Sequence, residues 1–309
     1  MNNVALIRSR SIRTLIFILA TSLAGFASVI GTFDRTFQVN GPVDLEVLTR
    51  SGDVTVRSGA AGRVSIHAKI NSGNSWFGGD HKADVQALQS NPPIRQNGNS
   101  IHIDYVNINN ISIDYEITVP ANTAISAHTG SGDQNVEGLQ GNVDLESGSG
   151  DLVMARLTGD MRFQTGSGNV KGRELSGPAR IKAGSGDIDI EETGAGDVDA
   201  RTGSGNITVN GINGGFHAEA GSGDIHGKGV PKSMWSARTG SGNVNISVPS
   251  DAAFDVDISS SSGSVTLGHP VTTTVQGRIG DSRKSVVGKV RGGGPVVSVH
   301  TGSGDVVVD

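Results

Sequence analysis

Aspartate and asparagine fill one recurring position of this chain, directly after a glycine, and no other residues come closer in type and spacing to a chemical site. The position holds Asp133, Asp151, Asn169, Asp187, Asn206, Asp224, Asn243 and Asp305. A row of carboxylates can hold cations, and a pair of carboxylates can hydrolyse a glycosidic bond. A calcium roll, however, repeats G-G-x-G-x-D in each half-turn, whereas here the aspartate follows the glycine at once. Identical residues along a repeat favour a structural role, because a catalytic pair should interrupt the repeat.

Charge alternates along this row from Asp151 to Asn243. Carboxylates stacked one strand spacing apart would repel by roughly 3 kcal/mol at an effective dielectric constant of about 20. An asparagine between two aspartates doubles the separation of the charges. We therefore predict a structural turn ladder, in which each Asp or Asn bonds to local backbone as in an Asx turn.

Catalytic and metal-binding patterns are missing elsewhere in the sequence. The chain has no cysteine, which excludes disulfides, thiolate metal sites and cysteine nucleophiles. Its eight histidines lack metal-ligand spacing, and the serines at 259–262 lack a G-x-S-x-G motif. We therefore predict no catalytic residue, no metal and no cofactor, in a protein that is not an enzyme.

Two aromatic residues, Trp76 and Phe77, lie in a glycine-rich loop outside the repeat. Exposed aromatic side chains on a loop are typical of a binding surface, so this is a candidate interaction loop. The alternative is that they cover the end of the repeat. Trp235, by contrast, falls in an apolar column and is predicted to lie in the core.

A repeat of about 18 residues must position all of these side chains. The second glycine of its Gly-Ser-Gly element stands at Gly132, Gly150, Gly168, Gly186, Gly205, Gly223 and Gly242. Apolar residues recur two and four places after this glycine, and seven and five places before it. Each half of the unit therefore alternates apolar with polar residues, the pattern of a strand with one buried face. An all-β parallel β-solenoid with about 18 residues per coil is favoured over an antiparallel meander, because a solenoid requires every unit to be alike.

The repeated turns resemble a bacterial family of adhesins catalogued as domain of unknown function 4097. The matching segments include TRSGDVTV at 49–56, SGSGDLVM at 147–154 and TGSGDVVV at 301–308. The resemblance covers nearly all of the chain after its first 30 residues. It implies a β-solenoid envelope protein, and it supplies no catalytic residues.

The N-terminus is typical of an export signal. Arg8, Arg10 and Arg13 precede an apolar run over 15–27, which is shorter than a membrane span. The alternative is an uncleaved N-terminal anchor. The formal charge is -5, and it becomes -8 without the first 27 residues. Such an acidic surface disfavours nucleic acid and anionic membranes as partners.

The sequence predicts three regions. Residues 1–27 form a signal peptide or anchor. Residues 32–119 form an N-terminal β section or cap with an inserted loop at 71–99, in which 82–89 is a helical turn or a strand. Residues 120–309 form the repeats, with an insertion at 271–295 that must leave the stack and rejoin it. Open solenoid ends require such covers, because they expose unpaired strand edges.

These patterns predict a non-catalytic, exported protein of the periplasm, cell surface or medium, acting as an adhesin or scaffold. Its expected partners are a glycan, another envelope protein or a second copy of itself, with membrane contact only through an uncleaved N-terminus. A component of envelope-stress sensing is the alternative, and a retained anchor would favour it. A polysaccharide-active enzyme is the third candidate, and it requires carboxylates that break the repeat.

Overall fold

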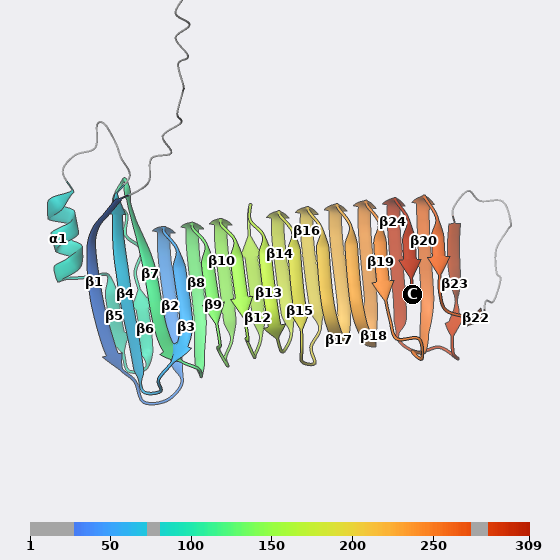
Figure 1. Ribbon diagram of the computed structural model, residues 1–309, viewed down its shortest axis with the longest axis horizontal. Coiled ribbons are helices and arrows are strands. Elements are labelled where there is room, and N and C mark those ends of the chain that lie inside the picture. Colours follow the sequence, from blue (N-terminus) through green and yellow to red (C-terminus); the bar gives the residue numbers. More distant parts are fainter. Residues whose placement is uncertain (1–27, 73–80, 273–283) are drawn as a thin grey trace, which may run out of the picture.

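The computed structural model describes residues 28–72, 81–272 and 284–309. The predicted signal segment 1–27 and the candidate loop residues Trp76 and Phe77 lie outside the described residues. Within the described part, 25 strands and one helix form a long stack (Figure 1). The protein is therefore an all-β solenoid, as predicted.

One coil shows how the repeat folds. Strand β10 (Val143–Ser149) crosses the stack, the chain reverses at Gly150 and Asp151, and β11 (Leu152–Ala155) returns on the opposite side. The next coil repeats this path 18 residues later, so β12 (Met161–Thr165) lies parallel to β10 with Val143 opposite Met161. Because the paired strands are parallel, the structure confirms the coil and excludes the meander.

Two facing sheets result, and each contributes one strand to every coil. In spatial order sheet 1 contains β5 (Ile94–Asn97), β6 (Ser100–Ile103), β2 (Val43–Ser51), β8 (Thr123–Ser131), β10, β12, β14 (Ala179–Ser185), β16 (Val198–Ser204), the second halves of β17 (Ile207–Ser222) and β18 (Ile225–Ser241), β24 (Val296–Ser303), β20 (Phe254–Ser262), β23 (Lys284–Val290) and β22 (Val271–Thr272). Sheet 2 contains β1 (Ser28–Gln38), β4 (Arg63–Ser72), β7 (Ile111–Pro120), β3 (Val54–Gly59), β9 (Gln134–Glu137), β11, β13 (Val170–Leu175), β15 (Ile188–Glu192), the first halves of β17 and β18, β19 (Val244–Ser247), β25 (Val306–Val308) and β21 (Val265–Leu267). Apart from the covering strands at the two ends, all of these strands pair in parallel.

The core is a narrow aliphatic layer between the sheets. Its inward columns are those that the periodicity predicts, and equivalent residues of successive coils pair directly, as Leu152, Val170 and Ile188 do. Trp235 is 1% exposed, packs edge-to-face on Phe216 with ring centroids 5.6 Å apart, and donates its indole N–H to the carbonyl of Gly214. A buried indole needs such an acceptor, so the largest side chain of the core is fully satisfied.

The order of coils departs from the sequence at the C-terminal end. Strands β24 and β25 do not follow β20 and β21 along the stack. Instead β24 lies between β18 and β20, and β25 lies between β19 and β21. The described strands of the predicted insertion, β22 and β23, continue sheet 1 beyond β20, and the coil that follows them re-enters the stack one position before β20.

The N-terminal end has the same kind of interleaving. The coil of β2 and β3 lies between the coil of β6 and β7 and the coil of β8 and β9, although it precedes both in the sequence. Two segments close to the chain ends are thus held on both edges by parallel strands. At each end of the stack, one coil therefore lies out of sequence order between two others.

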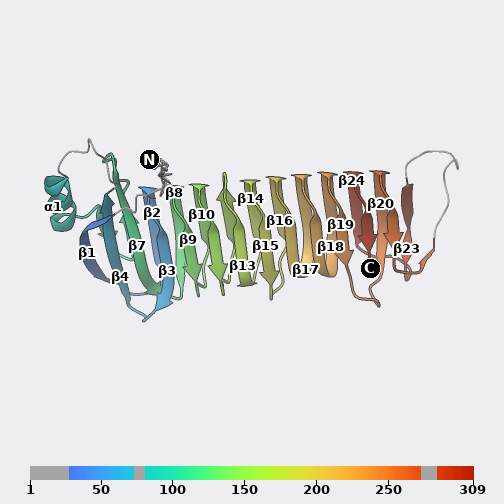
Figure 2. The same cartoon turned by 45° about the horizontal axis from the view of Figure 1, so that its top comes forward.

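Antiparallel strands cover both ends of the stack. Strands β5, β4 and β1 cover the first coil, and β23 with β22 continues sheet 1 beyond β20. The segment predicted as a helical turn or strand is helix α1 (Lys82–Ser90), which lies beside β1 (Figure 2). These elements pair or shield edges that would otherwise recruit other strands. The division of the chain at residue 119 remains a prediction.

Candidate interaction surface

A continuous ladder of hydrogen bonds runs along the Gly-Ser-Gly edge of the stack. The side-chain oxygen Oδ1 of each Asp or Asn accepts the backbone N–H of its counterpart in the next coil. In spatial order the members are Asp114, Asp53, Asp133, Asp151, Asn169, Asp187, Asn206, Asp224, Asn243, Asp305 and Ser264, with N···O distances of 2.7 to 3.1 Å. All eight residues of the predicted turn ladder thus lie in one row.

The bonding differs from the local Asx turn expected from the sequence. The acceptor reaches the neighbouring coil because the turns stack in register, which brings each Oδ1 within reach of the next turn's N–H. Three members were missed: Asp53, although its SGD motif was a usable signal, and Asp114 and Ser264, which carry no SGD or SGN motif. Insertion of the C-terminal coil places Asp305 next to Asn243, so charge alternation continues past the point where sequence order would break it.

Four aspartates lie next to one another at the N-terminal end of this ladder, from Asp114 through Asp53 and Asp133 to Asp151. We expect Asp133→Asn to raise the free energy of unfolding by about 0.5–1 kcal/mol, because it keeps the acceptor and removes like-charge repulsion. Asp133→Ala should lower it by about 1 kcal/mol, because the N–H of Asp151 loses its acceptor. Asp224→Asn is the matched control. Its neighbours in the ladder are both asparagines, so we expect almost no change in its free energy of unfolding in a urea titration. A gain equal to that of Asp133→Asn would contradict like-charge repulsion as the cause.

Buried hydroxyl groups form a second ladder just inside the turns. They donate to the carbonyl oxygen of the turn glycine in the adjacent coil, as Thr165 does to Gly150 at 2.9 Å and Thr239 does to Gly223 at 2.9 Å. Sequence reasoning missed this column, and the recurring Thr or Ser three places before the glycine was its signal. Both ladders use the turn's polar groups for stability.

The outward surface of sheet 1 carries an open groove of about 580 Å³ that crosses β2, β8, β10, β12 and β14. Its outward residues follow one another from strand to strand in the order Glu46, Ser126, Asp144, Arg162 and Arg180. The carboxylate of Asp144 lies 3.9 Å from Arg162, where the acidic part meets the cationic part. The groove therefore offers both hydrogen-bond acceptors and cationic donors along the axis of the stack.

A chain of polar contacts begins at Ser126 in this groove and continues through His128 to Glu146. Ser126 Oγ lies 3.0 Å from His128 Nε2, and His128 Nδ1 lies 3.2 Å from Glu146 Oε2. This order of contacts matches a nucleophile, a base and an acid. Strand β8 is, however, flanked by β2 and β10, so its backbone N–H groups are used in the sheet and cannot form an oxyanion hole. The chain of contacts is a polar surface network.

A similar network continues toward the N-terminal end. His102 lies between two carboxylates, with Nδ1 2.6 Å from Glu46 and Nε2 2.9 Å from Asp104. Arg95 donates to Asp104 and, as the largest effect, holds the pKa of that carboxyl below its usual value. Because these side chains bind one another, the end of sheet 1 presents an ordered, hydrophilic surface.

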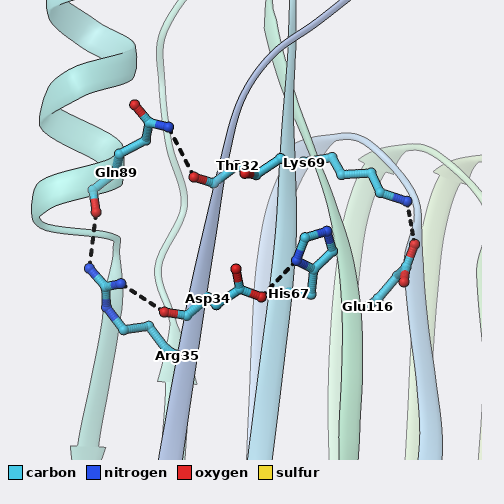
Figure 3. Close-up of polar contacts among 7 residues, drawn as sticks. All are labelled: Thr32, Asp34, Arg35, His67, Lys69, Gln89 and Glu116. Atoms are coloured by element: carbon cyan, nitrogen blue, oxygen red, sulfur yellow. Dashed lines mark hydrogen bonds and ion pairs between the residues drawn. The ribbon is translucent and has the colours of Figure 1, made fainter.

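The outer face of β1, β4 and β7 carries further ion pairs (Figure 3). Asp34 lies 2.8 Å from His67 Nδ1, and Lys69 donates to Glu116 at 2.5 Å. The hydrogen bond and charge of Lys69 lower the pKa of Glu116, and the same bond raises the pKa of Lys69. These groups are well exposed, so their effect on stability is small. They position the strands that cover the stack.

One acidic side chain interrupts the core. Glu192 is 5% exposed, lies opposite Leu175 in sheet 2, and has no hydrogen-bond partner on either carboxylate oxygen. Burial raises its pKa to about 7. Spacing within the repeat did not reveal it, because the position seven places after Gly186 is Thr193 and a register shift brings Glu192 opposite Leu175 instead.

The described residues contain neither a metal centre nor a membrane-spanning helix. No three His, Asp or Glu side chains of the described chain are grouped to hold a metal ion. None of the helical segments in residues 28–72, 81–272 and 284–309 has the length and apolarity that crossing a bilayer requires.

Comparison with known proteins places the chain in a family. A putative adhesin from Bacteroides fragilis is 14% identical, with a TM-score of 0.36 over 91% of this chain and 98% of the other. A putative cell adhesion protein from Clostridium sporogenes is 10% identical, with a TM-score of 0.20 over 90% of this chain and 98% of the other. No curated protein matches. A family model matches residues 154–309, which is half of the sequence, and the chain therefore belongs to the family described as Toastrack DUF4097.

Proposed function

We propose that this protein is a non-catalytic, exported component of the cell envelope, and that it acts as an adhesin or scaffold through the outward surface of sheet 1. Residues 1–27 would direct the export. The stack suits this role because it is held by parallel pairing, a continuous core and two polar ladders. Such a body can present one fixed surface over its whole length.

The groove on sheet 1 is the observation that carries the proposal. It crosses five strands of sheet 1 that are about 4.8 Å apart, so a linear polymer along the axis would meet one outward polar side chain at each step. Carboxylates and arginines on its walls provide acceptors and donors for hydroxyl groups. Its wall residues include no aromatic side chain, so each contact would be weak and binding would depend on repetition. We therefore propose a polysaccharide of the envelope or of a host surface as the ligand.

Binding to an array of bacterial and host polysaccharides tests this function. Arg162→Ala combined with Arg180→Ala should lower the apparent affinity for the retained glycans at least about tenfold, because the variant loses the cationic end of the groove. Lys171→Ala combined with Lys228→Ala is the matched control. It removes the same charge from exposed positions of sheet 2, and it should bind as the wild type does. Equal loss in both variants, or no retained glycan at all, would contradict the proposal.

A further inference from the structure

We propose that the coil of β24 and β25 is an exchangeable element through which a second copy of this chain binds. In the structure this coil fills a slot between β18–β19 on one side and β20–β21 on the other. In the exchanged dimer, the coil of each chain fills the slot of the other. This inference does not depend on the glycan groove.

Both walls of the slot belong to segments that precede the coil in the chain. Main-chain bonds join them to the coil on each side, as from Val244 N to Asp305 O and from Val306 N to Ser264 O, both 2.9 Å. With the coil absent, four strand edges would be unpaired, two in each sheet. Unpaired edges recruit further strands, so binding of a coil in the slot is strongly favoured.

The slot also selects the register of its occupant. Trp235, Val297 and Val256 align across the three strands of sheet 1. Both walls of the slot therefore require the same register of inward and outward residues from the strand between them. Side chains add further contacts: Thr301 donates to Gly242 O at 2.9 Å, and Ser260 donates to Gly304 O at 2.7 Å. The occupant that meets every one of these contacts is this same coil, whether from its own chain or from another copy.

A short hinge leads from β23 into the coil. It consists of Arg291–Pro295, and Arg291, Gly292 and Gly293 have φ values of 50°, 92° and 92°. Gly293 is confined as well, because a Cβ there would lie 2.2 Å from Asp255 Oδ1. A short hinge in which a non-glycine residue, Arg291, has a left-handed φ favours exchange, since opening it relieves that backbone strain. Five residues can extend over about 17 Å, enough to pass into an adjacent molecule.

The interleaved coil at the other end lacks this freedom. Strands β2 and β3 are followed by β4, which is paired with both β1 and β7, and β1 precedes them. That coil is fixed at both of its ends by paired strands, since Gln38 at the end of β1 lies opposite Arg63 at the start of β4. Exchange at the C-terminal slot disturbs only the hinge and conserves all contacts of the coil, so protein concentration decides between the closed and the exchanged form.

Engineered cysteines distinguish the two forms, because the chain has none of its own. Arg238 lies opposite His300 across the edge of the slot, so Arg238→Cys with His300→Cys reports which chain supplies β24. We expect a short thiol cross-linker to give covalent dimers on a denaturing gel after refolding at high concentration. The dimer fraction should fall at least about tenfold after refolding at a hundredfold lower concentration, as mass action requires.

The matched control is Glu219→Cys with Arg238→Cys, a pair on adjacent strands within the body of one chain. It should cross-link only within a chain under both conditions. Single-chain products from the Arg238–His300 pair at every concentration would overturn the proposal. Equal amounts of dimer from the two pairs would also overturn it, because they would indicate contact between intact surfaces.

Hinge length provides a second measurement that does not depend on the cross-linking pair. Deletion of Gly292 and Gly293 should raise the dimer fraction in size-exclusion chromatography several-fold, because the shortened hinge cannot turn back into its own slot. Insertion of three glycines at the same place should lower it several-fold. A dimer fraction that does not change with hinge length would overturn the proposal.

Discussion

Glu192→Leu is expected to raise the free energy of unfolding at pH 8 by about 3 kcal/mol. Folding raises the pKa of Glu192 from 4.5 to about 7, and each unit of that difference corresponds to about 1.4 kcal/mol. The cause is burial in an apolar column opposite Leu175, where neither carboxylate oxygen has a partner. Leu175 and the equivalent Leu157 and Leu139 of the preceding coils are fully buried, so a leucine at 192 places an apolar side chain next to them.

The pH dependence of unfolding tests the cause. Because the pKa is higher in the folded chain, the folded state keeps a proton that the unfolded state has lost. The contribution of Glu192 to stability should therefore be greatest below about pH 4.5, decline as the pH rises, and level off above about pH 7. The free energy of unfolding, measured by urea titration between pH 4 and pH 8, should depend on pH more steeply in the wild type than in Glu192→Gln. The same slope in both would show that Glu192 is not the group responsible.

Gly223→Ala is expected to lower the free energy of unfolding by more than about 3 kcal/mol. The glycine has a φ of 139°, which L side chains rarely adopt, and an added Cβ would lie 1.9 Å from the carbonyl oxygen of Gly205. That oxygen belongs to the backbone of the adjacent coil and cannot move without separating the stack. Backbone strain and the clash therefore act together. Thermal unfolding followed by circular dichroism measures the loss.

Gly98→Ala is the matched control for this prediction. Its φ of 61° also lies in the left-handed region, but no heavy atom lies within 4 Å of the added Cβ. Its cost should be about 1 kcal/mol, since only the conformational penalty applies. Equal losses at the two sites would show that close stacking is not the reason for the glycines of the turn.

The repeat made most of the fold predictable. Apolar residues at fixed distances from the turn glycine fix which side chains face inward, and a constant period of 18 or 19 requires each coil to match the next. Spacing predicts the parallel solenoid and the burial of Trp235. It also predicts that Asp151, Asn169 and the other turn residues lie in one row. These properties are local, because each depends only on a coil and the one beside it.

The outward side chains of sheet 1 could be assigned to a face but not to a site. Alternation places Ser126, Asp144 and Arg162 on the outside, yet a groove also depends on which coils lie side by side. Glu46 reaches this groove only because β2 lies next to β8, and the chain separates these strands by more than 70 residues. Spacing within the repeat contains no signal for such a contact.

The amino-acid sequence by itself determined the coil, its inward columns, its glycine turns and the polar row along one edge. Only the tertiary structure decided the order of coils at the two ends, the bonding of Asp and Asn between coils, and the isolation of Glu192. The physical reason is that coils of equal length and phase present nearly the same edge. The local sequence pattern therefore does not determine which coils lie side by side, whereas the connecting segments and the packing of the whole stack do.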